Sequence, residues 1–238
     1  LPSYIKMMEA IKDLVADANT VAEAVAKGNL DIRVDATKHG GEFRMVVEGL
    51  NRTMDAIAEP VEEMMEVVKR TALNDVTRKM EKDYQGAWNE LKNGVNSFIR
   101  IITHIQSTVI KVSNGDLSEL ENDRKIGRRC ENDELMPAMI RMMESIQRLT
   151  EDARELTSAA KAGRLNVRVD VTRHNGEYRR VIEEFNSTLD ALTGPLNVAA
   201  EYVERISRGD LPPKITEEYY GDFNEIKNNL NTCIDSIN

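Results

Sequence analysis

Apolar residues recur at alternating steps of four and three along several segments of the chain. The clearest ladders are Phe43, Val47, Leu50, Met54, Ile57 and Tyr178, Ile182, Phe185, Leu189, Leu192. This spacing predicts amphipathic helices that share a coiled-coil seam. Ahead of each ladder, residues 30–34 and 165–169 alternate apolar and polar side chains. That alternation predicts an extended connector with one buried face between two helices.

The chain repeats itself at a shift of 163 − 28 = 135 positions. Residues 163–195 then align with residues 28–60 without a gap, and 17 of these 33 positions are identical. A shorter step is marked by an apolar residue followed by Asn at 50–51, 95–96, 185–186 and 230–231, with Met142-Met143 in the remaining slot. The chain is therefore predicted to hold five similar units in series. We expect them at residues 1–59, 60–103, 104–149, 150–194 and 195–238, numbered one to five below.

A second marker precedes each connector. It reads Gly28-Asn29-Leu30, Asn74-Asp75-Val76, Gly115-Asp116-Leu117, Gly163-Arg164-Leu165 and Gly209-Asp210-Leu211. Asn is among the non-glycine residues that best tolerate a left-handed backbone, so Asn74 in a glycine slot indicates that this geometry is what the position requires. The second helices are expected to open near an acidic residue, which is Glu42, Glu134, Glu177 or Asp222.

The ladders of units two and three run on to the next glycine marker, so the second helix of each should also be the first helix of the following unit. Pro60 and Pro195 interrupt the other two junctions, where fresh helix starts or kinks are expected. Parallel helices joined in this way leave an apolar seam that one chain does not cover. Its central positions are Leu50, Val95, Met142, Phe185 and Leu230. The expected fold is all-α, a parallel four-helix coiled-coil bundle formed by a homodimer.

Composition narrows the possible functions. The 238 residues carry a net charge of −9, which disfavours nucleic acid as a partner. No apolar run approaches the ~20 residues that cross a bilayer, and the chain begins and stops within periodic segments, as expected of a fragment. Cys130 and Cys233 lie far apart, so neither a zinc site nor a disulfide framework is indicated. No catalytic, cofactor or metal-binding motif is apparent.

The units resemble the HAMP domain. The resemblance rests on the glycine that ends a first helix, the Leu two residues later, the spaced connector and the acidic opening of the second helix. Residues 222–231 are similar to the HAMP arrays of bacterial methyl-accepting chemotaxis receptors. The resemblance to the HAMP domain covers nearly the whole chain, and it implies concatenated HAMP domains from such a receptor or a related sensor kinase.

The resemblance also implies a role. HAMP units lie between a sensor and an output domain and transmit a conformational change along a parallel dimer. A downstream signalling domain is implied, coupling to a chemotaxis histidine kinase and its adaptor. The fragment would be cytoplasmic and non-enzymatic, in a full-length protein possibly associated with the inner membrane. The alternative is a passive coiled-coil spacer that holds two chains together without switching.

Several residues have two interpretations. His39 and His174 are expected in exposed polar turns, with pH sensing as the alternative. The acidic helix openings either stabilise helix N-termini or contact the neighbouring helix in one signalling state. The repeated Asn either tunes the bundle or sets register from a hydrated flank. Cys233 is expected to be a small buried hydrophobe, and Cys130 lies in a basic connector that favours its thiolate.

Overall fold

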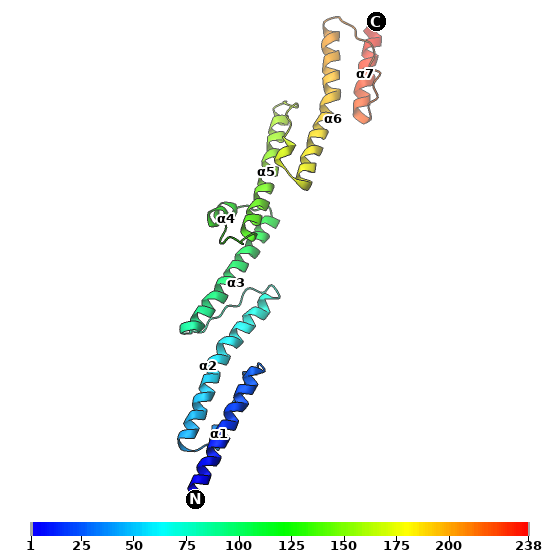
Figure 1. The fold of residues 1–238 in the computed structure, drawn as a ribbon. Helices are drawn as coiled ribbons and strands as arrows, with labels where there is room; N and C mark the ends of the chain where they lie inside the picture. Colours follow the sequence, from blue (N-terminus) through cyan, green and yellow to red (C-terminus); the bar gives the residue numbers. More distant parts are fainter. Residues whose placement is uncertain (1, 238) are drawn as a thin grey trace. The chain divides into compact units, whose positions relative to one another are not determined.

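The computed structural model describes residues 2–237, and within them it contains seven α-helices. These are α1 (Pro2–Ala26), α2 (Gly41–Thr71), α3 (Gly86–Ser113), α4 (Leu120–Ile126), α5 (Leu135–Lys161), α6 (Gly176–Ser207) and α7 (Gly221–Ile237). Short 3-10 turns lie at Ala36–Lys38 and Val171–Arg173. The all-α prediction is confirmed, and Figure 1 shows irregular connectors between successive helices. The chain divides into two compact parts, one ending at Ile110 and one starting at Lys111, and each is described by itself.

The first helix of every unit ends in the same backbone motif. In α1 the amide of Gly28 donates to the carbonyl of Val25 and the amide of Asn29 to that of Ala24, the paired bonds of a Schellman cap. The motif requires a left-handed residue, and Gly28 has a φ of 81°. Asn74 takes the same place with a φ of 62°, the one non-glycine residue with positive φ among the described residues. The predicted left-handed backbone at Asn74 is therefore confirmed.

The second helices start close to their acidic residues. Glu42, Glu177 and Asp222 lie in the first turns of α2, α6 and α7. The fourth case differs, because Glu134 is the residue immediately before α5 and its side chain caps no amide of the helix. Instead the carboxylate of Asp133 accepts a hydrogen bond from the amide of Met136.

Helices α2 and α6 both continue past their prolines. Of the two outcomes expected at Pro60 and Pro195, a fresh helix start is wrong, since both residues lie inside unbroken helices of 31 and 32 residues. Proline lacks the amide that would bond four residues back, so the carbonyls of Ala56 and Ala191 lose an intrahelical donor. Pro60 is fully buried, and its ring packs inside the unit. The second helix of one unit is thus the first helix of the next at the proline junctions as well.

The connectors are extended where the sequence alternates. Leu30, Ile32 and Val34 are half-buried while Asp31 and Arg33 face solvent, as predicted. Unit three departs from this expectation. Its connector contains the helix α4, where an extended segment was expected. Leu120 of α4 is buried, so this short helix supplies the apolar contacts that a strand-like connector supplies elsewhere.

Units two and four each contain a small cluster of buried apolar residues. In unit two it joins Val67 of the first helix, Met80 of the connector and Ile99 of the second helix. In unit four the same three elements contribute Leu156, Val169 and Ile182. Each core is therefore shared by the connector and both helices, and the connector is as much a packing element as a link.

Candidate functional site: the connector and its anchors

Each extended connector is held to the second helix by one asparagine. The amide of Val34 donates to Oδ1 of Asn51 at 3.0 Å, and Nδ2 of Asn51 donates to the carbonyl of Val34 at 2.8 Å. The same pair of bonds joins Asn96 to Met80, Asn186 to Val169 and Asn231 to Ile215. We call this two-way pairing the amide clamp.

The amide clamp explains why the marker residue is Asn. A half-buried extended segment has backbone donors and acceptors that need partners. A carboxamide offers one acceptor oxygen and two donor hydrogens, so one side chain satisfies both groups of a connector residue. Neither sequence interpretation of this Asn described a hydrogen bond to the connector.

Unit three replaces the clamp with an apolar contact. Met143 occupies the slot, and its side chain is completely buried. A thioether cannot donate to a carbonyl, so a connector that relied on the clamp would leave its backbone unpaired here. The amide of Gly127, 16 residues before Met143, donates to the carbonyl of Asp123 at the end of α4 instead. The change of Asn to Met thus coincides with a change in the structure of the connector.

A second set of contacts ties the connector to the first helix. Nε2 of His39 lies 2.7 Å from Oδ2 of Asp17, and Nε2 of His174 lies 2.6 Å from Oδ2 of Asp152. Arg173 adds a hydrogen bond to the other oxygen of Asp152 at 2.9 Å. We call the acidic residue of the first helix and its connector partners the acid anchor.

The histidines are therefore not in exposed turns. His39 is 8% exposed and His174 is 3% exposed, which corrects the expectation from sequence. The turn itself is present, since each histidine follows a 3-10 turn and its own amide donates to the first residue of that turn. The imidazoles are buried because each is held against the first helix by its carboxylate partner. That partner lies 22 residues earlier in the chain, so the local sequence does not reveal the pairing.

Unit two has an acid anchor of another kind. Oε1 of Glu63 accepts hydrogen bonds from the amides of Glu81 and Lys82, and Oε2 accepts one from the hydroxyl of Tyr84 at 2.7 Å. Burial alone would raise the pKa of Glu63, but these hydrogen bonds together hold its pKa below the ordinary value. Burial, and then the carboxylate of Glu63, raise the pKa of Tyr84.

An arginine fixes the start of the connector in units one and four. Arg33 donates to the carbonyls of Leu30 and Ile32 and also pairs with Asp55 of α2. Arg168 makes the equivalent bonds to the carbonyls of Leu165 and Val167 and to Asp190 of α6. The marker leucines 30 and 165 are thus held through their backbones close to the second helix.

The predicted seam positions remain open in the single chain. Leu50, Val95 and Leu230 are half-buried, whereas Met142 is 37% and Phe185 is 42% exposed. Neighbouring positions that face the connector are closed, and Val47, Ile99, Met143, Ile182 and Ile234 are buried. Cys233 is exposed, which corrects the expectation of a buried thiol. The connector covers one side of each second helix and leaves the other side apolar and uncovered.

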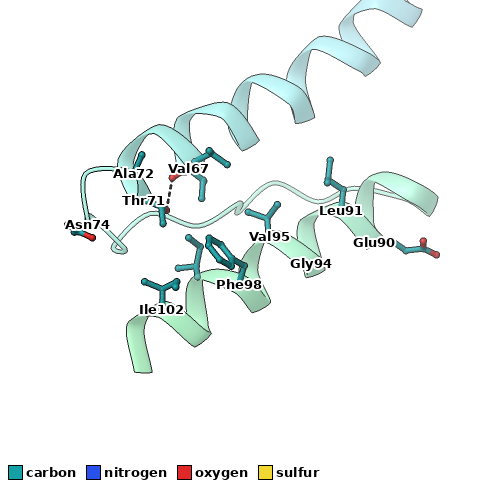
Figure 2. A pocket seen from close by; sticks show the side chains of 12 residues that line it. Val67, Thr71, Ala72, Asn74, Glu90, Leu91, Gly94, Val95, Phe98 and Ile102 are labelled. Carbon is teal, nitrogen blue, oxygen red and sulfur yellow. Dashed lines mark hydrogen bonds between the residues drawn. The ribbon is translucent and has the colours of Figure 1, made fainter. Parts of the chain in front are cut away.

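An apolar groove lies in unit two. It has a volume of about 760 Å³ and lies between the end of α2 and the first half of α3. Figure 2 shows Val95 and Phe98 rising from α3 toward Val67 and Thr71 of α2. Phe98 is 52% exposed although it lines an apolar surface. In unit four a smaller groove of the same kind is lined by Phe185 and Leu189 of α6 and Leu156 of α5.

The remaining predicted residues lie at separate markers and helix openings and do not come together in one site within residues 2–237. Gly28, Gly115, Gly163 and Gly209 have positive φ at the ends of first helices. Leu117 and Leu211 follow their glycines as half-buried residues. Glu177 pairs with Arg180 of its own helix, and Glu134 pairs with Arg128 of its own connector. No helix within residues 2–237 combines the length and the apolar character that crossing a membrane requires.

Comparison with known protein families gives two overlapping matches. One model, described as HAMP domain, matches residues 38–104 and 173–238. A second model of the same description matches residues 15–59 and 138–194. Both models match twice; the two matches of the first model start 135 residues apart, and those of the second model end 135 residues apart. The search of solved structures gave no match to the chain.

Proposed function

The chain belongs to the HAMP domain family, whose members are signal-relay modules of sensor proteins, and we propose that its tandem units relay a conformational change from an input to an output domain. The proposed context is a bacterial chemotaxis receptor or sensor kinase. The output would couple to a chemotaxis histidine kinase and its adaptor, in the cytoplasm. The proposed units are residues 1–59, 60–103, 104–149, 150–194 and 195–238.

We propose that the working form is a parallel homodimer. HAMP domains typically act as dimers. The observation that carries the proposal is the division of each second helix into a side closed by the connector and an open apolar side. The grooves of units two and four lie along that open side, and Phe98 and Phe185 project from it. A second copy brings the same apolar residues in the same order, so a two-fold related copy of each unit can cover the open side of that unit.

Solution mass and a native cysteine test this arrangement together. Light scattering over a hundred-fold dilution should give twice the chain mass. In a parallel dimer, Cys233 of one protomer faces Cys233 of its partner across the seam of unit five, and mild oxidation should link them. The matched control carries Cys233→Ser with Asn228→Cys, which moves the thiol to an exposed position off the seam. A monomeric mass, or equal linking of both cysteines, would refute the parallel bundle.

The relay itself is tested by output. Glu177 opens the second helix of unit four, and we propose that it acts in relaying through the helix start. Replacing it with Ala in the full-length protein should lock or invert the output. Glu184, exposed on the same helix, provides the control substitution Glu184→Ala, which should leave the output unchanged. A passive spacer predicts no effect of either substitution.

A further inference from the structure

The two positions that form the acid anchor can be aligned in units one, two, four and five. The first-helix residue recurs at 17, 63, 152 and 198, and the connector residue at 39, 84, 174 and 219. Units one and four use an Asp–His pair, and unit two uses Glu63 with Tyr84. Unit five is the exception, because Val198 stands where the other three units place a carboxylate.

The connector of unit five is bound differently as a result. Val198 lies beside Ile215 and Tyr219 around one small apolar pocket. The hydroxyl of Tyr219 donates to the carboxylate of Glu217, which belongs to the same connector. Tyr84, its equivalent in unit two, instead reaches across to Glu63 of the first helix. The connector of unit five thus bonds to itself where that of unit two bonds to α2.

The two kinds of anchor restrain different motions. The amide clamp binds the connector to the second helix in units one, two, four and five alike. The acid anchor instead binds the connector to the first helix, where it adds buried, directional bonds to the apolar contacts of the core. A buried charge-assisted hydrogen bond has a fixed direction and length, whereas apolar contact is non-directional and tolerates sliding.

We propose that the acid anchors hold the connectors of units one, two and four to their first helices, and that unit five, where Val198 replaces the carboxylate, is the most compliant of the four units with an amide clamp. In unit four the acidic residue is the most deeply buried of the three, because Asp152 is 2% exposed, and it accepts from both Arg173 and His174. The inference extends the proposed relay, since a relay needs a place where the helices shift. It names that place as the connector and first helix of unit five.

A single substitution adds the missing anchor. Val198→Glu recreates in unit five the Glu–Tyr pair of unit two, with Tyr219 already in position. In unit two the amides of Glu81 and Lys82 donate to the carboxylate, and their equivalents here are Thr216 and Glu217. Hydrogen–deuterium exchange at these two amides in the intact chain should slow by about tenfold or more, as expected of a new charge-assisted bond. Val203→Glu, on an exposed site of the same helix, should leave them unchanged.

The reciprocal variant removes an anchor. Asp152→Val with His174→Tyr gives unit four the pair found in unit five, and exchange across residues 170–175 should accelerate by about tenfold. Unchanged exchange at Thr216 and Glu217 in Val198→Glu, or across residues 170–175 in the double variant, overturns the proposal. Because Val198→Glu adds a partner, its result does not depend on a variant that fails to fold. The readout lies within one chain, so failure of the dimer or the relay would be seen separately, in the mass and output experiments.

Discussion

Asn186 and Val169 exchange two hydrogen bonds, at 3.1 Å from the amide of Val169 and at 2.9 Å to its carbonyl. Val169 is a core residue of unit four, where it packs with Leu156 and Ile182. The clamp therefore fixes the connector residue that the first and second helices both touch. Loss of this pairing should loosen the core itself, in addition to the connector.

Asn186→Ala should destabilise unit four by about 2–4 kcal/mol, since each buried backbone group that loses its partner costs roughly 1–3 kcal/mol. Chemical denaturation, with hydrogen exchange to localise the effect, measures this change. Asn197→Ala, at an exposed site on the same helix, serves as the control and should alter stability by less than about 0.5 kcal/mol. Equal effects of the two substitutions would contradict the clamp.

Met143→Asn should lower the stability of unit three, although it introduces the residue found at this position in the other units. The slot is occupied by Asn in four units, yet in unit three the side chain is fully buried and the backbone bonds of α4 are already made. A buried amide without partners costs about 1–3 kcal/mol. We therefore expect a lower thermal midpoint for this variant than for Met143→Leu, which conserves the apolar contact. An increase in stability would mean that the connector can return to the clamped form.

The backbone of Asn74 gives a prediction that depends on conformation alone. Asn74→Gly should raise stability slightly or leave it unchanged, because glycine adopts a φ of 62° without steric cost. Asn74→Ala should lower stability by about 1–2 kcal/mol, the cost of a left-handed backbone for an ordinary L-residue. The two melting curves, measured side by side, separate this effect from loss of the amide side chain, because both variants lack it.

Stability of unit two should fall in acid through Glu63. Its pKa is held below the ordinary value of 4.5, so the folded state binds this proton more weakly than the unfolded state does. The contribution is complete above pH 4.5 and is lost as the pH falls through the lower pKa of the folded state. Unfolding curves between pH 3 and 6 should show the loss, and Glu63→Gln should reduce the slope in that range. An identical slope in the variant would assign the acid sensitivity to other carboxylates.

Much of this fold is legible in the sequence because its determinants are local. The four-three spacing, the glycine marker and the alternating connector each act within a few residues, and they correspond to helices, helix ends and extended segments, apart from the connector of unit three, which contains α4. The left-handed backbone of Asn74 was predicted for the same reason, since it depends on the conformation of one residue.

The features that the sequence did not predict depend mostly on tertiary contacts, between residues that lie far apart in the chain. Asp17 and His39 are separated by 22 residues, and neither carries a local sign of the pairing. Extending the 135-residue shift upstream would have given a hint, because Asp152 then falls on Asp17. The prediction of a fresh helix start at Pro60 was wrong because proline removes only one backbone hydrogen bond from the helix, and the packing of a long amphipathic helix offsets that loss. The helix α4 is seven residues long, too short for periodicity to reveal.

The open seam leads to a last prediction, on Phe98. This side chain is 52% exposed within one chain and lines the groove of unit two beside Val95 and Ile102 (Figure 2). Phe98→Glu places a charge on a surface that is already solvated in the monomer, so the unit itself should keep its fold. In the proposed dimer the same charge would be buried near its symmetry mate without a partner, at a cost of several kcal/mol. The dimer should therefore dissociate at least a hundred-fold more readily, as measured by sedimentation.

Met45→Glu is the matched control, because Met45 is 67% exposed on α2 but lies off the ladder. Dissociation by both substitutions, or by neither, would show that the groove is not where the two copies meet.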